Sequence, residues 1–424
     1  MNASAFSKLH LQALQSLRKK ISGDIRWDKR TRLLYATDAS IYQEMPCAVC
    51  FPRDINDIRI ALTFCDKEGI SAFPRGAGTS LAGQTVGGGM CLDLGRYMRN
   101  ILEIDPSRRL ARVEPGVIQD ELNRAAAAHG LVFGPDTSTA NRAMIGGMVG
   151  NNSCGSRSIH YGTTRDHLLE MTASLSSGEL VHLSDWGPQE LSAILEANSA
   201  LGNIVRGLKQ IVDNNKALIA ERFPHSNVTR RNTGYALDYL AQTVITDGGK
   251  APLNLARFLA GSEGTLAIMA EATLNLTPLP NAKGMFVGMF NSLSKALEAS
   301  VRAVSGGPSA VELIDDKILA MTENQLVHQH NRFFIEGNPA AILIVEFFGE
   351  NDEAVSEKIF NCREALLADG LSYACPIIAP QKMAQVWALR RAGLGLLMGM
   401  KSAAKPLAFV EDSAVAVTDL PNYI

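Results

Sequence analysis

A glycine-rich loop constrains this chain more than any other feature of its sequence. Residues 74–89 read PRGAGTSLAGQTVGGG, with six glycines between an apolar run and the strand-like MCLDL. Glycine is used where backbone must approach another group closely. The loop lacks the Gly-Lys-Ser/Thr ending of a P-loop, and its spacing fails the dinucleotide fingerprint. Consecutive backbone N–H groups could still bind a pyrophosphate, and a bare surface turn stays open for this loop alone.

Two further clusters of small residues lie far along the chain. Residues 134–167 read GPDTSTANRAMIGGMVGNNSCGSRSIHYGTTRDH, which combines little side-chain bulk with many hydrogen-bond donors. A flat ring system could lie along such a backbone. The third cluster, Gly261, Ser262, Glu263 and Gly264, forms a turn directly before the strand-like TLAIMAEATL. Three such clusters at separated points in one domain predict a large, extended ligand.

Composition excludes some classes of protein. The 424 residues are enough for two or three domains. Lys plus Arg (41) nearly balance Asp plus Glu (43), which disfavours a nucleic-acid partner. The first twenty residues lack the apolar core of a signal peptide, and no apolar stretch is long enough to span a membrane. We therefore expect a cytoplasmic protein without a transmembrane segment, with peripheral attachment to a membrane left open.

The order of segments predicts an α+β protein. Strand-like and helix-like segments alternate up to residue 280, with hairpin turns at residues 105–107 and 176–178 and helix over residues 188–223. After LPNAKG a new rhythm of strands and helices begins. We expect a helical lead-in over residues 1–45, one domain over 46–280 and a second over 281–424.

Two metal-like patterns are weak. Cys47 and Cys50 in PCAVCFP have the spacing of a metal or redox pair, but no second pair or histidine is near in sequence. A buried strand explains them better, and seven cysteines, an odd number, suit reduced thiols. His328 and His330 in LVHQHN fit a solvated loop better than a metal site. No metal is expected.

The clusters carry a family resemblance when they are taken together. Three segments resemble the FAD-binding domain of the vanillyl-alcohol oxidase, or PCMH-type, superfamily: PRGAGTS, PDTSTANRAMIGGMVGNNSCG with its later YG, and GSEGTLAI. TDASIYQEMP, RRNTGYALDYL and FVEDSAV are similar to FAD-linked oxidases related to D-lactate, glycolate and D-2-hydroxyglutarate dehydrogenases. The resemblance implies a PCMH-type FAD-binding domain of two subdomains, followed by an α+β substrate or cap domain.

The resemblance also assigns cofactor contacts. Near the FAD pyrophosphate it places Pro74, Arg75, Gly76, Gly78, Thr79, Ser80 and Gly83, with Gln84 in the same loop. Along the rest of the cofactor it places Ser138, Gly146, Gly147, Asn152, Gly155 and Tyr161, with Glu263 and Gly264 in the third loop. Members with covalent flavin often carry histidine in the first loop, where this chain has Thr79. We therefore expect FAD to be held without a covalent bond.

Oxidation of a 2-hydroxy acid on a flavin needs a cation for the carboxylate and a base for the hydroxyl proton. The Trp-x-x-Arg element in QVWALRRAGLGLL resembles the family's carboxylate-binding element, which makes Arg390 the substrate-binding candidate. The alternative is an ordinary charged helix face formed by Arg390 and Arg391. Arg230 and Arg231 are weaker candidates. His160 is expected to pack against the cofactor, and the family's catalytic histidine segment is absent, so the base is unassigned.

The resemblance leaves two functional hypotheses. One is the flavin part of a D-2-hydroxy-acid dehydrogenase that passes electrons to a carrier other than NAD. The other is an FAD-binding subunit or fragment that docks with a missing catalytic or iron-sulfur part. The similar large enzymes carry iron-sulfur motifs, and no such cysteine spacing is encoded here. The second domain is accordingly expected to be truncated. A flavin reductase of nucleotide-sugar type is disfavoured because it does not explain FVEDSAV.

Overall fold

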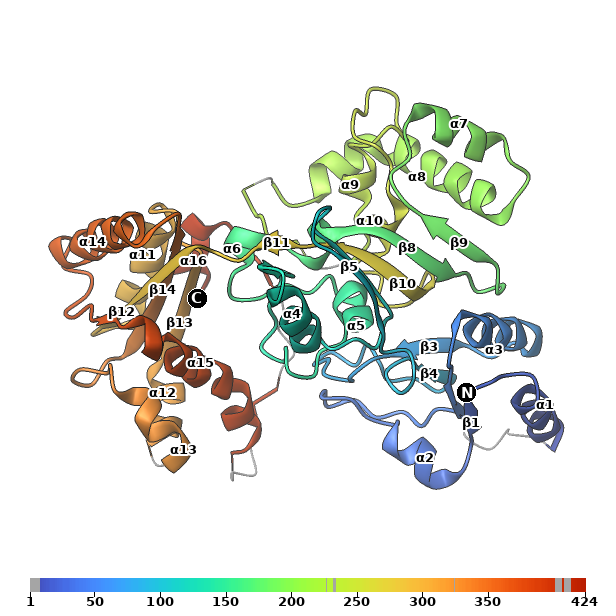
Figure 1. The fold of residues 1–424 in the computed structure, drawn as a ribbon, viewed down its shortest axis with the longest axis horizontal. Coiled ribbons are helices and arrows are strands. Elements are labelled where there is room, and N and C mark those ends of the chain that lie inside the picture. The colour runs from blue at the N-terminus through green and yellow to red at the C-terminus, as the bar shows by residue number, and fades with distance from the viewer. Residues whose placement is uncertain (1–7, 226, 232–233, 324, 401–405, 408–412) are drawn as a thin grey trace.

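The computed structural model describes residues 8–225, 227–231, 234–323, 325–400, 406–407 and 413–424. Figure 1 shows two lobes: the first 280 residues form one, and the C-terminal domain forms the other. The chain passes from one lobe to the other where strand β11 (Thr277–Pro278) leads into β12 (Ala282–Phe290). The predicted domain divisions at residues 45 and 280 stay predictions.

The first sheet presents the glycine-rich loop. Its strands, in spatial order, are β1 (Asp24–Arg26), β2 (Ala48–Phe51), β4 (Met90–Asp93) and β3 (Ala72–Arg75). β2, β4 and β3 run parallel, and β1 pairs antiparallel with β2. Parallel pairing requires a crossover, which α3 (Ile55–Glu68) supplies between a side-chain cap at Asp54 and a left-handed Gly69. The glycine-rich loop leaves this sheet at the end of β3.

The second sheet is antiparallel and carries the other two clusters at its margin. Its order is β5 (Ile101–Asp105), β6 (Leu110–Val113), β10 (Ile268–Asn275), β8 (Leu168–Ser174) and β9 (Leu180–Leu183). Both hairpins, β5–β6 and β8–β9, turn where the sequence predicts. Asp105 accepts hydrogen bonds from the backbone of Ser107 and Arg108, and Gly178 has a positive φ of 85°.

Helices and short elements surround these two sheets. They are α1 (Lys8–Arg18), α2 (Lys29–Leu34), α4 (Gln119–Ala127), β7 (Leu131–Val132), α5 (Ile145–Gly150), α6 (Ser158–Tyr161), η1 (Thr164–His167), α7 (Pro188–Glu196), α8 (Ala200–Arg222), α9 (Leu237–Leu240) and α10 (Leu255–Leu259). Leu14 and Leu17 of α1 are buried in the core of the first sheet. The segment before residue 45 is therefore packed into this sheet and also supplies its edge strand β1.

The C-terminal domain is a sheet with helices on both faces (Figure 1). Its antiparallel strands are ordered β13 (Ala310–Asp315), β14 (Ala341–Gly349), β12 and β15 (Ile377–Ile378). Its helices are α11 (Leu293–Val304), α12 (Asp316–Glu323), α13 (Leu326–Gln329), η2 (His330–Arg332), α14 (Asp352–Ala368), η3 (Pro380–Lys382), α15 (Met383–Met398), η4 (Val417–Asp419) and α16 (Leu420–Tyr423).

Alternation along β14 divides this domain into two cores. Leu343, Val345 and Phe347 share one core with residues of α11 and α14. Ile342 and Ile344 share the other with residues of α12 and α15. Successive side chains of a strand point to opposite faces, so α15 is packed on one defined face of the sheet. That helix carries Arg390.

Candidate functional site

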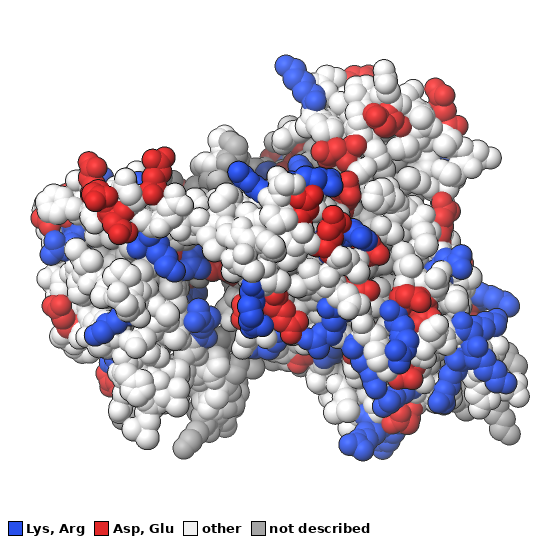
Figure 2. All heavy atoms as spheres, viewed as in Figure 1, with Lys and Arg blue, Asp and Glu red and all other residues white. Residues whose placement is uncertain are grey.

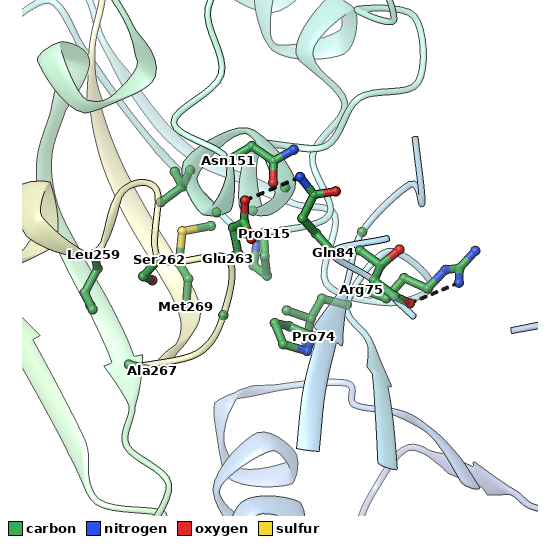
Figure 3. Close-up of a pocket in the computed structure, with 18 of the residues that line it drawn as sticks. Pro74, Arg75, Gln84, Pro115, Asn151, Leu259, Ser262, Glu263, Ala267 and Met269 are labelled. Atoms are coloured by element: carbon green, nitrogen blue, oxygen red, sulfur yellow. Dashed lines mark hydrogen bonds between the residues drawn. The ribbon is translucent and has the colours of Figure 1, made fainter. Parts of the chain in front are cut away.

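The three clusters of small residues meet at one pocket in the first lobe (Figure 3). Pro74, Arg75, Gly76, Gln84 and Thr85 come from the first loop and its flanks, Gly146, Gly147, Val149, Gly150 and Asn151 from the second cluster, and Ser262, Glu263, Gly264 and Ala267 from the third. Leu94, Pro115, Met171, Leu259 and Met269 complete the lining. Segments almost two hundred residues apart thus line a single cavity, as the sequence predicts for an extended ligand.

Arg75 holds the first loop to its surroundings. Its guanidinium lies 5.2 Å from the centre of the Tyr35 ring, and Nη1 lies 3.5 Å from the carbonyl oxygens of both Tyr35 and Thr85. Gly78 has a φ of 65°, and a Cβ there would lie 2.6 Å from Arg75 Nη2. A side chain at Gly78 would therefore displace the arginine.

The second cluster supplies a wall without side chains. The short helix α5 carries Gly146 and Gly147, and a Cβ on Gly146 would lie 2.8 Å from Pro115 Cβ. A Cβ on Gly147 would meet nothing within 4 Å. Gly146 therefore lets α5 approach Pro115 closely, whereas Gly147 leaves open space beside the pocket.

Backbone hydrogen bonds join the third cluster to the second. The amides of Gly261 and Glu263 donate to the carbonyls of Val149 and Gly150, each at 2.9 Å. Glu263 has a φ of 53°, a left-handed conformation that costs energy for a residue with a Cβ. Gln84 Nε2 lies 3.3 Å from Glu263 Oε1, and Figure 3 shows these side chains reaching toward one another. Such backbone strain is typical of binding sites.

The third loop also closes against the first. Gly264 has a φ of 74°, and a Cβ there would lie 2.3 Å from Pro74 Cγ. Glycine at this position thus allows both the backbone conformation and the close approach. The pocket walls are consequently fixed to each other at the contacts between first and third loops and between second and third.

The residues present fit an FAD. The pocket joins apolar walls, including Met171 and Met269, to polar groups and bare backbone. That combination suits a ligand with flat rings and phosphates. The open space at Gly147 agrees with this fit.

Half of the predicted cofactor residues line the pocket. They are Pro74, Arg75, Gly76, Gln84, Gly146, Gly147, Glu263 and Gly264. The others, Gly78, Thr79, Ser80, Gly83, Ser138, Asn152, Gly155 and Tyr161, lie outside its lining, and their contacts with FAD stay predictions. The sequence reasoning missed apolar wall residues such as Leu259 and Met269. Their side chains are ordinary for core positions, and only the fold brings them to the pocket.

Some of the residues outside the lining have clear structural roles. A Cβ on Gly155 would lie 1.3 Å from the carbonyl oxygen of Asp136, so glycine is needed there for close packing. Tyr161 packs against Gly134, where a Cβ would lie 2.5 Å from its ring. Asn152 has a φ of 48° and its Oδ1 accepts a hydrogen bond from the amide of Arg165.

Arg390 lies on α15 in the C-terminal domain and is absent from the pocket lining. Its Nε donates to Glu312 Oε2 at 2.5 Å, and 37% of its side chain is exposed. Among the described residues, its terminal guanidinium nitrogens have no hydrogen-bond partner within the molecule. Arg390 can therefore accept a carboxylate while Glu312 holds its inner nitrogen. Its substrate role stays a prediction.

The two lobes are joined by an ionic cluster around the buried Glu346, which the sequence pattern did not indicate. Arg157, in the later part of the second glycine cluster, forms hydrogen bonds with Asp136 and with Glu346 of the C-terminal domain. Trp387 of α15 donates its indole N–H to the same glutamate. No local motif marks these residues, because they lie far apart in sequence.

The remaining candidates are placed as follows. His160 is not in the pocket lining, and its ring packs against Tyr161 and Phe348 with centroids 4.6 and 5.2 Å apart. Arg231 pairs with Asp238, and Arg230 is exposed. Within RRNTGYALDYL, Asn232 and Thr233 lie outside the described residues. Within FVEDSAV, residues 409–412 lie outside them as well.

The weak metal patterns gain no support. All seven cysteines are buried, and burial raises the pKa of Cys47 to about 11. Within the part of the chain that the structure describes, no group of three or more histidine, cysteine, aspartate or glutamate side chains could hold a metal. Over the same residues, none of the helices is both long and apolar enough to span a bilayer.

Figure 2 shows charges of both signs over most of the visible face. Lysine and arginine gather mainly over the elements near the N-terminus, where acidic side chains are interspersed. Basic and acidic residues nearly balance over the whole chain, but they are not evenly spread over this face.

Comparisons with known proteins agree with the pocket and the fold. Residues 46–184 match the model described as FAD binding domain, and residues 279–424 match FAD linked oxidases, C-terminal domain. Alkyldihydroxyacetonephosphate synthase has a similar fold, with a TM-score of 0.63 and 17% identity over 92% of this chain and 68% of that one. p-Cresol methylhydroxylase with substrate bound gives a TM-score of 0.61 and 14% identity, covering 92% and 70%.

The fold and pocket therefore define a PCMH-type FAD-binding protein of α+β class, as the sequence predicts. More narrowly, its two matched parts are an FAD binding domain and the C-terminal domain of FAD linked oxidases.

Its sequence is similar to the D-2-hydroxyglutarate dehydrogenases of Escherichia coli K12 (34% identity over 98% of this chain and 42% of the relative) and of Pseudomonas putida KT2440 (33%, 97% and 41%). It is also similar to glycolate oxidase subunit GlcD of Bacillus subtilis, with 28% identity over 96% of this chain and 73% of that subunit. The chain thus spans about two fifths of the length of the two dehydrogenases.

Proposed function

We propose that this chain is the flavin-binding part of a dehydrogenase that oxidises a D-2-hydroxy acid, with D-2-hydroxyglutarate, D-lactate and glycolate as candidate substrates. The observation that carries the proposal is the meeting of three separated glycine clusters at one pocket in a chain with both domains of an FAD linked oxidase. Similarity to dehydrogenases and an oxidase subunit named for these substrates supports the substrate class.

Bound FAD would supply a hydride acceptor for the substrate carbon that carries the hydroxyl group. The pocket residues would hold the cofactor through bare backbone at Gly146 and Gly147 and through polar groups at Gln84 and Ser262. Arg390 would bind the substrate carboxylate through its terminal nitrogens, since a guanidinium fork matches a carboxylate. Electrons would pass to an electron carrier or to an iron-sulfur partner, and the acceptor would not be NAD.

We further propose that the FAD is not covalently bound. The proposal rests on Thr79, which stands in the first loop where members of the resembled family with covalent flavin often carry histidine. Acid precipitation of the loaded protein tests this proposal. Yellow colour is expected in the supernatant, and flavin that stays with the pellet would contradict it.

Anaerobic mixing tests the dehydrogenase proposal. The FAD-loaded chain is mixed with D-2-hydroxyglutarate, D-lactate or glycolate while the flavin absorbance near its visible maximum is followed. Bleaching by at least one D-2-hydroxy acid is expected, and Arg390→Ala should slow it without loss of FAD. Loss of FAD in that variant would instead show that Arg390 is misplaced.

The second candidate function is an FAD-binding subunit that lacks a complete catalytic site. It is supported by the share of the dehydrogenases, about two fifths, that this chain spans. Under this alternative no hydroxy acid bleaches the flavin of the chain alone. Bleaching would appear only after the remaining part of such a dehydrogenase is added.

A further inference from the structure

We propose that Arg157 and Glu346 are positioning residues that lock helix α15 against the later part of the second glycine cluster, so that Arg390 is presented to substrate in one fixed orientation. The proposal rests on the proposed function because it takes Arg390 as the carboxylate-binding group. The lock itself is a property of the fold and can be tested separately.

The acidic side of the lock lies on one face of the C-terminal sheet. Glu312 of β13 pairs with Ile344 of β14, and Glu346 is two residues further along β14. Directly paired residues and residues two apart on a strand lie on the same face. Ile344 belongs to the core that includes α15 residues. Both glutamates therefore face α15.

Glu346 collects three donors although only 1% of its side chain is exposed. Arg157 Nε and Nη2 lie 2.6 and 3.1 Å from its two carboxylate oxygens, and Trp387 Nε1 lies 3.1 Å from Oε1. The Arg157 guanidinium also lies 5.0 Å from the centre of the Trp387 ring. One buried carboxylate thus binds an arginine of the first lobe and a tryptophan of α15.

The other end of the lock lies in the same segment as the pocket-lining Asn151, six residues further along the chain. Arg157 Nη1 is 2.7 Å from Asp136 Oδ2, and the Arg157 amide donates to Asp136 Oδ1 at 3.3 Å. Two residues earlier, Gly155 packs so closely on the Asp136 carbonyl that any side chain would collide. The backbone between Gly150 and Asn151, which line the pocket, and Arg157 is therefore short and tightly held.

Trp387 and Arg390 are three residues apart on α15, so they are neighbours on one face of the helix. Glu346 binds the first, and Glu312 binds Nε of the second at 2.5 Å. Glu312 thus holds the arginine itself, Glu346 holds the helix at Trp387 one turn earlier, and the terminal guanidinium nitrogens are left for a ligand. A buried ion pair adds little net stability compared with apolar packing, but it can specify one geometry. These contacts therefore fit a role in positioning α15 and Arg390 better than a role in stabilising the fold.

The lock can be observed directly by 19F NMR of protein labelled with 5-fluorotryptophan. The chain has three tryptophans, and Trp387→Phe assigns the signal of interest. In the FAD-free chain, Arg157→Lys and Glu346→Gln should shift or broaden the Trp387 signal and leave Trp27 and Trp186 unchanged. The matched controls Arg302→Lys and Asp369→Asn remove an exposed pair of the same domain and should move none of them.

The positioning role is tested with oxalate, a small dicarboxylate, titrated into the FAD-loaded protein while the flavin absorbance is followed. Arg157→Lys and Glu346→Gln should weaken oxalate binding by about tenfold or more, as expected for a displaced polar anchor, with FAD affinity unchanged. If the Trp387 signal is unchanged in both variants, the proposed contact between Arg157, Glu346 and Trp387 is contradicted. A moved signal with unchanged oxalate binding would overturn its positioning role.

A wild-type protein that binds no oxalate and is bleached by no hydroxy acid would count against the proposed function, and the positioning of Arg390 would fall with it. The Trp387 signal would still decide whether the lock exists. The two failures are therefore distinguishable.

Discussion

At the scale of single residues, the pocket depends on positions where a side chain is absent or strained. Gly264 and Gly78 have positive φ values and tight neighbours, and Glu263 takes a left-handed conformation despite its Cβ. The sequence could identify the glycines as a group because their clustering has no role in a simple core. It could not separate Gly155, which packs on Asp136, from Gly147, which faces open space, since both sit in the same run.

Gly147→Leu should block the pocket without unfolding the protein. The side chain would enter open space, so the thermal midpoint should stay nearly unchanged while FAD affinity falls by about tenfold or more, equivalent to about 1.4 kcal/mol. Flavin fluorescence titration measures the affinity. Gly207→Leu is the matched control, because a Cβ on this helical glycine also meets nothing within 4 Å and it lies on α8, outside the pocket lining. Equal loss of FAD in both variants would contradict this assignment.

The buried thiols should be unreactive in the folded protein. Burial raises the pKa of Cys65 to about 12 and of Cys362 to about 11, so both are neutral at pH 8. Iodoacetamide needs the thiolate, and we expect labelling only after unfolding. Because these folded pKa values exceed the usual 9.0, the related stability is present below pH 9 and is lost as the pH rises toward 11 or 12. Rapid labelling of the native chain would contradict the buried placement.

At the scale of secondary-structure elements, short strands and capped helices place the loops. Asp54 and Gly69 fix the ends of α3, the first by a side-chain cap and the second by its left-handed conformation. The strand β13 and the use of both sheet faces in the C-terminal domain were not predicted. Glu312 and Glu346 lie on two neighbouring strands, and a single sequence does not reveal that they face the same helix.

The Arg157–Glu346 contact should show strong coupling in a double-mutant cycle. Arg157→Met leaves a buried carboxylate without its arginine, which costs about 3–5 kcal/mol in comparable buried pairs. The double variant Arg157→Met with Glu346→Met should recover much of that loss, because no unpaired charge stays buried. Urea unfolding measures each free energy of unfolding. Additive losses would show that the two side chains act independently.

At the scale of the whole molecule, the sequence predicted the fold class and an FAD-binding domain. Those predictions rested on the three clusters and on a family resemblance, and the matched family models confirm the family. The contact between lobes could not be predicted, since it joins residue 157 to residues 346 and 387 through tertiary structure alone. The relation between the pocket and Arg390 is for the same reason the least predictable part of the proposed site.

Calorimetric titration of the flavin-free chain with FAD tests most directly whether the three clusters form one cofactor site. The account predicts saturable binding of one FAD per chain, with a negative heat-capacity change because apolar ring surface becomes buried. Absence of saturable binding by a folded chain, or binding of more than one FAD with equal affinity, would contradict it.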